Sequence, residues 1–171
     1  WGTKDHGRIW KLDVDNPNNE ERREVKELLG DDFTKYDKFK LGDLLRHKDM
    51  RIRLKAQFEL ANRDDEGMAI FSAALDRREH QLARVHAIWG ISQLTRKNVR
   101  YGVTLIPVLT DADPEIRAQA AKWIGDVRFQ GDGDKLIPLL KDEYSRARFF
   151  AAEALGRIAY KPAVEPLIEL L

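Results

Sequence analysis

One motif occurs four times along this chain, and it constrains the fold more than any other feature. Each copy reads Arg-x-x-Ala-x-x-x-(Leu/Ile)-small, and the copies begin at Arg53, Arg84, Arg117 and Arg148. The steps between them are 31, 33 and 31 residues. A period of this length is typical of helical repeats, in which one unit buries its apolar face only by stacking on its neighbours.

A second motif precedes the first within each unit. Leu105-Ile106-Pro107-Val108-Leu109 is matched 31 residues later by Leu136-Ile137-Pro138-Leu139-Leu140, and again by residues 167–171. Each unit is therefore expected to contain a shorter leading helix, a tight turn and a longer second helix. Asp113-Pro114 marks one turn, because aspartate caps a helix and proline fits its first position.

Together the motifs predict an all-α protein, a right-handed α-solenoid of about four and a half helical hairpins behind a short extended N-terminal segment. Within the second helices, the alanine of the motif shares a face with the aliphatic residue four positions later, so the core is expected to contain Ala56, Ala87, Ala120 and Ala151. About ten helices are expected, with ends defined to within a few residues. Their predicted ranges are 20–30, 36–46, 49–63, 66–76, 79–95, 98–109, 114–127, 131–140, 144–158 and 163–171.

The first nineteen residues do not follow the repeat. Residues 6–12 end in an alternation of apolar and polar side chains, which indicates a strand, and residues 13–19 are rich in Asp and Asn, which indicates a linker. We therefore divide the chain into residues 1–19, the end of a preceding propeller-like domain plus a linker, and residues 20–171, the helical-repeat domain. Both ends look cut, and we expect a longer parent protein.

The repeats resemble the HEAT-like repeats first associated with phycobilin lyases. The resemblance rests on residues 111–121 and 151–158 and extends over roughly residues 36–171. It implies the solenoid fold but says little about function, because such scaffolds serve many roles. In that family the recurring Asp and Arg residues mostly tie adjacent repeats together, and the resemblance implies the same role for the arginines that open the motif here.

The order of strand, linker and helical repeats is similar to that of certain large bacterial proteins described as membrane-bound dehydrogenases. Those combine a sugar-dehydrogenase-like propeller, HEAT repeats and a cytochrome c domain. The resemblance implies an extracytoplasmic bacterial parent, although the segment itself does not indicate a location. This chain departs from the whole family because it lacks the propeller body and any Cys-x-x-Cys-His haem site.

No pattern in the sequence indicates catalysis or a cofactor. The chain has no Cys, which excludes disulfides, thiolate zinc sites and covalently attached haem within it. The four histidines, His6, His47, His80 and His86, lack zinc-ligand spacing, and residues 13–20 lack the glycine that a calcium loop requires. We therefore expect no catalytic residue, no metal site and no cofactor, and a segment that is not an enzyme.

Charge and hydropathy narrow the class of partner. Thirty Lys and Arg against 29 Asp and Glu leave a net charge of +1, whereas proteins that bind nucleic acid usually show a clear basic excess. No apolar run approaches 18 residues, so no membrane insertion is expected. The expected partners are proteins or flanking domains of the same polypeptide.

The second helices provide the predicted partner surface. With each motif arginine as position zero, positions three, seven and ten face the core, and positions two, five and nine form a stripe opposite, on the concave side that repeat proteins use for binding. Large aromatic residues in this stripe indicate an interface, although they could instead pack on neighbouring helices. The predicted partner-binding residues are Lys55, Phe58, His86, Trp89, Gln93, Lys122, Phe150 and Arg157.

The predicted function is a non-catalytic scaffold that docks proteins or domains, as the HEAT module of a multidomain extracytoplasmic dehydrogenase. One alternative is a nucleic-acid binder, since some DNA-repair glycosylases are HEAT-like, but Asp126 and Glu153 interrupt the basic stripe that this would need. The other is a tetrapyrrole-binding enzyme that resembles the phycobilin lyases. That alternative depends on repeat motifs that many non-enzymes share.

Overall fold

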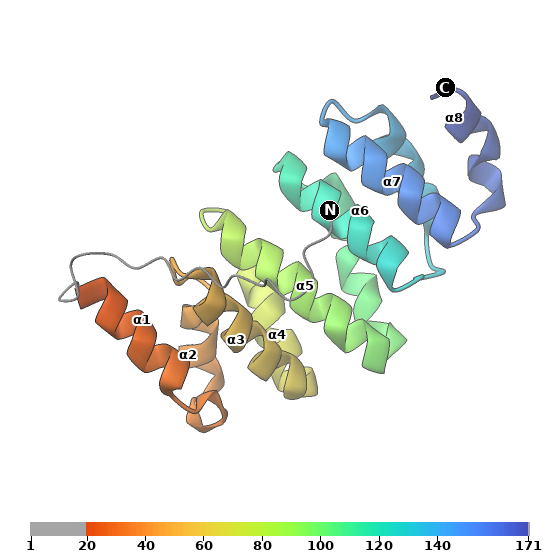
Figure 1. Ribbon diagram of the computed structural model, residues 1–171. Coiled ribbons are helices and arrows are strands. Elements are labelled where there is room, and N and C mark those ends of the chain that lie inside the picture. Colours follow the sequence, from red (N-terminus) through yellow and green to blue (C-terminus); the bar gives the residue numbers. More distant parts are fainter. Residues whose placement is uncertain (1–19, 171) are drawn as a thin grey trace, which may run out of the picture. The chain divides into compact units, whose positions relative to one another are not determined.

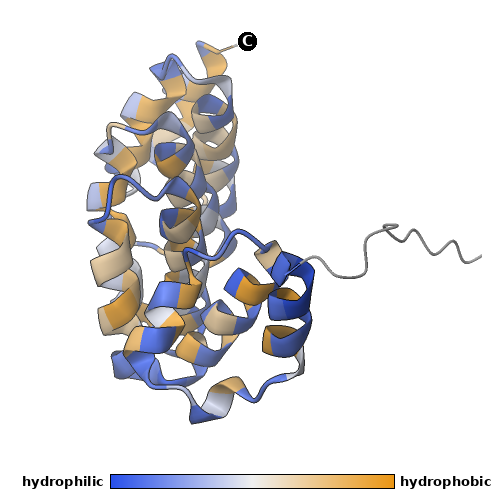
Figure 2. Ribbon diagram, turned by 90° about the vertical axis from the view of Figure 1, so that its left-hand side faces the viewer, coloured by the Kyte–Doolittle hydropathy of each residue, from blue (hydrophilic) through white to orange (hydrophobic). Residues whose placement is uncertain are grey.

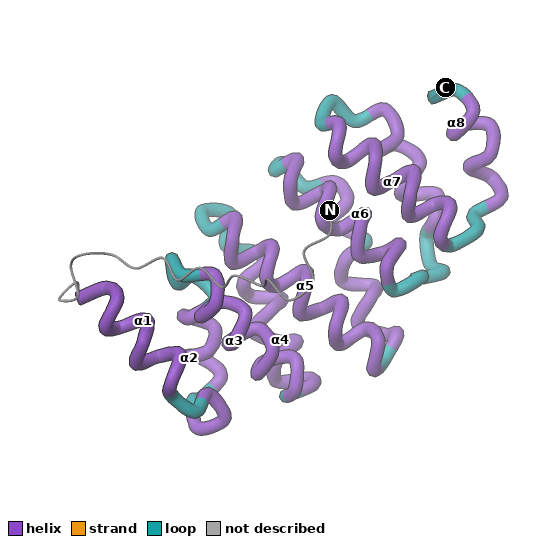
Figure 3. Tube along the Cα trace, viewed as in Figure 1, coloured by secondary structure: helices purple, strands orange, loops and turns teal. Residues whose placement is uncertain are grey.

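The computed structural model describes residues 20–170, and all the regular secondary structure of that range is helical (Figures 1 and 3). The chain divides into two compact units, the first ending at Asp31 and the second beginning at Asp32. The first unit contributes α1 (Glu20–Gly30), and the second contains the repeats. The strand and linker expected in residues 1–19 lie outside the described residues, and the assignment of that segment to a preceding domain stays a prediction.

The second unit is a helical solenoid, as predicted, in which leading and second helices alternate along the chain. The second helices are α3 (Met50–Asn62), α5 (Gln81–Lys97), α6 (Pro114–Asp126) and α7 (Ser145–Arg157). They pack side by side in that order, so each has one neighbour before it and one after it, except at the ends of the row (Figure 1). The first two leading helices are α2 (Lys38–Leu44), which follows the short η1 (Phe33–Lys35), and α4 (Asp64–Leu75).

The later leading helices are wound more tightly than predicted. The ranges 98–109, 131–140 and 163–171 were expected to be α-helical but form 3₁₀ segments, apart from one short α-helix near the end. These are η2 (Val99–Leu105), η3 (Pro107–Thr110), η4 (Gly133–Lys141), η5 (Lys161–Ala163) and α8 (Val164–Ile168). Proline has no N–H to donate and its ring clashes with the preceding turn, so Pro107 and Pro138 prevent a regular α-helix there.

The predicted core is confirmed. All four motif alanines are fully buried, and the aliphatic residues four positions after them, Leu60, Ile91, Ile124 and Leu155, are at most 1% exposed. Apolar and polar residues alternate along the helices, as expected for helices that bury one face (Figure 2). No helix in residues 20–170 is long and apolar enough to cross a bilayer.

Aspartates begin several of the helices, as the sequence indicated. Asp113 accepts a hydrogen bond from the Glu115 backbone N–H at 2.9 Å, and Pro114 occupies the first turn behind it. Asp49 accepts in the same way from Arg51 N–H at 2.8 Å. These caps fix where the second helices start, and so set the register of the residues along them.

Candidate partner-binding surface

The arginines that open the motif hold the repeats together. Arg84 donates from Nε to the Leu75 carbonyl at 2.8 Å, and its two terminal nitrogens lie 3.1 and 2.5 Å from the oxygens of Asp111 in the next repeat. Arg117 forms the equivalent pair with Asp142, at 2.7 and 2.8 Å. In both cases the aspartate lies six residues before the next motif arginine. These two inter-repeat pairs confirm the structural role that the family resemblance implied.

Among the described residues, the other two motif arginines bind only the turn before their own helix, so the expectation that they tie adjacent repeats is wrong for them. Arg53 donates to the carbonyls of His47 and Lys48 at 2.7 Å each, and Arg148 donates to those of Asp142 and Glu143. Six residues before Arg84, where an aspartate would close the pair with Arg53, the sequence has Arg78. The tie between these two repeats must therefore come from other side chains.

The side chains that tie these repeats together project from the second helices themselves. His86 Nδ1 is 2.8 Å from Oε1 of Gln57 on the preceding second helix, and the amide of Gln57 donates to Gln93 at 3.1 Å. One step along, Trp89 Nε1 donates to Gln119 Oε1 at 3.0 Å. Neutral hydrogen bonds thus join α3 to α5 and α5 to α6, and they use residues that the sequence had placed on the partner surface.

Burial along the predicted stripe follows the position in the repeat. Position two is covered in the two middle repeats: the expectation that His86 faces solvent is wrong, since it is only 2% exposed, and Gln119 at the same position is 6% exposed, whereas Lys55 and Phe150 at this position are half-buried. His86 and Gln119 each contact the preceding second helix, and packing against that helix buries them. A single-helix projection does not include this neighbour, which explains the error.

The remaining stripe residues keep part of their surface free. Phe58 at position five is 51% exposed, and Arg157 at position nine is also exposed. The half-buried stripe residues are Lys55, Trp89, Gln93, Lys122 and Phe150. The surface that the second helices offer a partner is therefore made of positions five and nine, together with Lys55 and Phe150 at position two, and it sets aromatic rings among hydrogen-bonded polar groups.

Most of the charge on this face is paired within the chain. Asp126 accepts from Lys122 on its own helix at 2.5 Å and forms an ion pair with Arg157 of the next second helix, which also binds Glu153 at 2.8 Å. Because these cations have carboxylate partners, they do not form the free basic stripe that phosphate binding requires. Within residues 20–170, no three His, Asp or Glu side chains are grouped so that they could hold a metal ion.

The sequence did not predict the exposure of Phe149. This residue is 63% exposed and packs edge-on against Phe150, with ring centroids 5.3 Å apart. Val85 and Ala118, at the same position of earlier repeats, are buried, because another second helix follows theirs. In the described chain no second helix follows α7, so the exposure of Phe149 reflects its place at the end of the row.

Because His86 is buried, the stability of the fold should depend on pH. Burial and the nearby Arg53 charge lower the pKa of His86 from about 6.5 to about 4. Between these values the unfolded chain binds a proton that the folded chain does not, so the free energy of unfolding should fall as the pH falls, by at most about 1.4 kcal/mol per pH unit. Urea unfolding of the unsubstituted chain and of the His86→Gln variant, at pH 7, 6 and 5, measures this dependence. The unsubstituted chain should lose more stability than the variant as the pH falls, and equal losses would contradict the conclusion that the imidazole is buried and neutral.

Three comparisons bear on this architecture. Residues 103–171 match the family model described as HEAT repeats. An engineered protein of known crystal structure is similar in fold, with a TM-score of 0.50 and 19% sequence identity over 80% of this chain and 68% of that one. A second engineered protein has a TM-score of 0.43 and 20% identity, and covers 80% of this chain and 70% of that one. No curated protein sequence matches this chain. The likeness to the first engineered protein concerns the fold alone.

Proposed function

We propose that this chain is a non-catalytic scaffold that binds a protein, or a flanking domain of its own polypeptide, through the second-helix surface. That surface is defined by positions five and nine of the repeats together with the half-buried residues beside them. Its members are Lys55, Phe58, Trp89, Gln93, Lys122, Phe150 and Arg157. His86 is no longer a contact residue in this proposal, because it is buried beneath Trp89.

One observation carries the proposal: Phe58 places an aromatic ring, half exposed, on a face where Lys122 and Arg157 are already paired with Asp126. An exposed ring of this size forgoes about 1.5–3 kcal/mol of burial, which a partner would recover. Aromatic side chains are enriched in protein interfaces, whereas paired surface charges add orientation more than affinity. A surface of this composition suits protein rather than nucleic acid.

Trp89, at the same position of the next repeat as Phe58, is the candidate residue for the centre of the interface. Its ring packs edge-on against His86, with centroids 4.9 Å apart, and its indole N–H is held by Gln119. A ring fixed in this way loses little freedom when a partner covers it, which favours tight binding. The same contacts imply that Trp89 also contributes to the stability of the fold, so Phe58 is the better position to modify in a binding experiment.

The parent protein is proposed to be a multidomain extracytoplasmic dehydrogenase of the kind whose domain order this chain resembles. In it, the repeats would dock the neighbouring propeller or cytochrome domain and leave the chemistry to them. The proposal for the surface does not depend on that parentage, since an independent protein could occupy the same face.

A photo-crosslinking amino acid in place of Phe58, incorporated in the cells that make the protein, tests the proposed surface. The matched control is the same crosslinker in place of Val103, which is 58% exposed but belongs to a leading segment, η2. The proposal expects a discrete crosslinked protein or domain from position 58 and little from position 103. Equal yields at both positions, or no product at position 58, would contradict it.

A further inference from the structure

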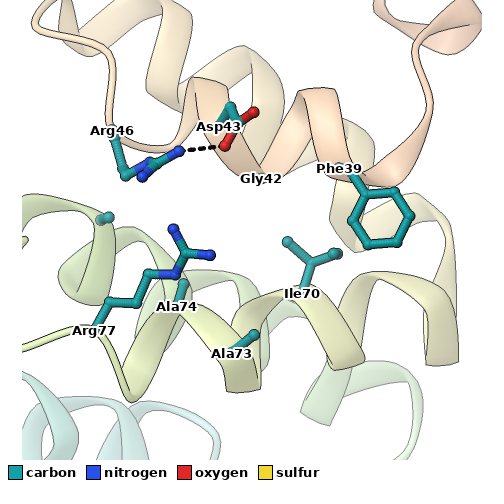
Figure 4. A pocket seen from close by; sticks show the side chains of 9 residues that line it. Phe39, Gly42, Asp43, Arg46, Ile70, Ala73, Ala74 and Arg77 are labelled. Carbon is teal, nitrogen blue, oxygen red and sulfur yellow. Dashed lines mark hydrogen bonds and ion pairs between the residues drawn. The ribbon is translucent and has the colours of Figure 1, made fainter.

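A pocket lies between the first two leading helices, α2 and α4, and Ala83 near the start of α5 also borders it (Figure 4). It is hollow because the side chains that border it are small: Gly42 on α2 faces Ala73 and Ala74 on α4. A Cβ at Gly42 would lie only 3.0 Å from Cγ2 of Ile70, so glycine lets the two helices approach while the recess stays open. The cavity measures about 180 Å³.

The pocket is apolar at its centre and at one rim. Ile70 lies beside the recess, and the ring of Phe39, which is 68% exposed, stands at the edge (Figure 4). Small-molecule sites usually have about 300–1,000 Å³, so this cavity is too small for a cofactor and suits one apolar side chain. A side chain seated there would cover part of the exposed Phe39 ring, which is favourable by the hydrophobic effect.

The other rim carries an unbalanced positive charge. Arg46 and Arg77 both line the pocket, and the single carboxylate beside them, Asp43, forms an ion pair with Arg46 (Figure 4). Within the described part of the chain, the Arg77 guanidinium has no ion pair and no hydrogen bond, and only its backbone is bonded: the N–H donates to the Ala74 carbonyl and the carbonyl accepts from the His80 N–H. A guanidinium binds a carboxylate through two parallel hydrogen bonds, so Arg77 is ready to receive one.

We propose that this pocket binds an acidic peptide segment of a partner protein. One apolar side chain of the peptide enters the recess between Gly42 and Ala73, and an adjacent carboxylate pairs with Arg77. The apolar recess and the free guanidinium are side by side, so a single short motif, an aliphatic residue followed by Asp or Glu, satisfies both. This site is independent of the second-helix surface and does not depend on the function proposed for it.

The probe is an acetylated and amidated peptide, Gly-Leu-Glu-Gly, titrated into the full chain and followed by the methyl NMR signals of Ile70, Ala73 and Ala74. Saturable shifts at these methyls are expected. Peptides with Gln in place of Glu, or Ala in place of Leu, should bind about tenfold more weakly, which corresponds to the loss of one charge-assisted contact or one buried side chain.

Two variants of the chain complete the test. Arg77→Gln should weaken the Glu peptide about tenfold and leave the Gln peptide unaffected, whereas Arg78→Gln, on a residue that does not line the pocket, should change neither. Ala73→Phe, at an exposed position, should fill the recess and abolish the shifts without unfolding the chain. The proposal is overturned if millimolar peptide produces no saturable shift, if Glu and Gln peptides bind equally, or if the same methyls shift with protein concentration alone, which would make a second copy the occupant.

Discussion

The Asp111→Ala substitution is expected to lower the free energy of unfolding by about 3–5 kcal/mol relative to the unsubstituted chain. Arg84 is only 4% exposed, and Asp111 is the one carboxylate that faces its guanidinium among the described residues. Breaking a buried pair from one side leaves the other charge desolvated and unpaired, and this accounts for most of the cost. Urea unfolding monitored by circular dichroism measures the loss.

An exposed ion pair provides the control. Asp43 and Arg46 also form a pair, but the side chains are 64% and 32% exposed, so Asp43→Ala should cost less than about 1 kcal/mol. If the two aspartate variants lose similar stability, the pair between Arg84 and Asp111 does not tie these repeats together. If Arg84→Met combined with Asp111→Leu restores stability, the cost came from the stranded charge, as expected.

The Gly125→Ala variant is expected to lose about 1–3 kcal/mol. A Cβ at this position would lie 2.7 Å from the Ala154 Cα and 2.9 Å from its Cβ. These atoms belong to the backbone of α7 and to a methyl group with no other rotamer, so the clash is relieved only by moving the two second helices apart. Thermal unfolding of the variant measures the effect as a lower melting temperature.

Gly156 occupies the same position of the next repeat and gives the matched control. An added Cβ there meets nothing within 4 Å, and the residue is the last but one of α7. Alanine is favoured over glycine in a helix by up to about 0.5–1 kcal/mol, so Gly156→Ala should raise stability by less than this amount. The two substitutions are chemically identical and should have opposite signs. A change of the same sign in both would show that helix propensity, not the close approach of α6 and α7, decides the outcome.

The motifs predicted those parts of the structure that depend on one helix and its repeat. Ala120 and Ile124 are buried where the period places them, and Asp113 caps the helix that it precedes. Each of these follows from spacing along the chain and from local hydrogen bonding, both of which are visible in the sequence.

The sequence could not predict features that depend on how neighbouring helices approach. His86 is buried because α3 packs against its side of α5. The pattern of residues along α5 does not indicate on which side the neighbouring helix will pack. The pocket beside Arg77 depends on the spacing of α2 and α4, which Gly42 and Ile70 set together from different repeats. The missing N–H of Pro138 disfavours a regular α-helix and so indicates the 3₁₀ segment. The repeat pattern favours an α-helix at the same place, and the prediction followed that pattern.

Side-chain footprinting of the complex is the most direct test of the central claim, that the second helices present the protein-binding surface. Hydroxyl radicals would label the chain alone and in complex with the partner captured by crosslinking. Protection of Phe58, Trp89 and Phe150, with unchanged labelling of Val103 and Val99 on the leading segments, is the predicted result. Protection confined to the leading segments, with Phe58 and Trp89 labelled as in the free chain, would contradict it.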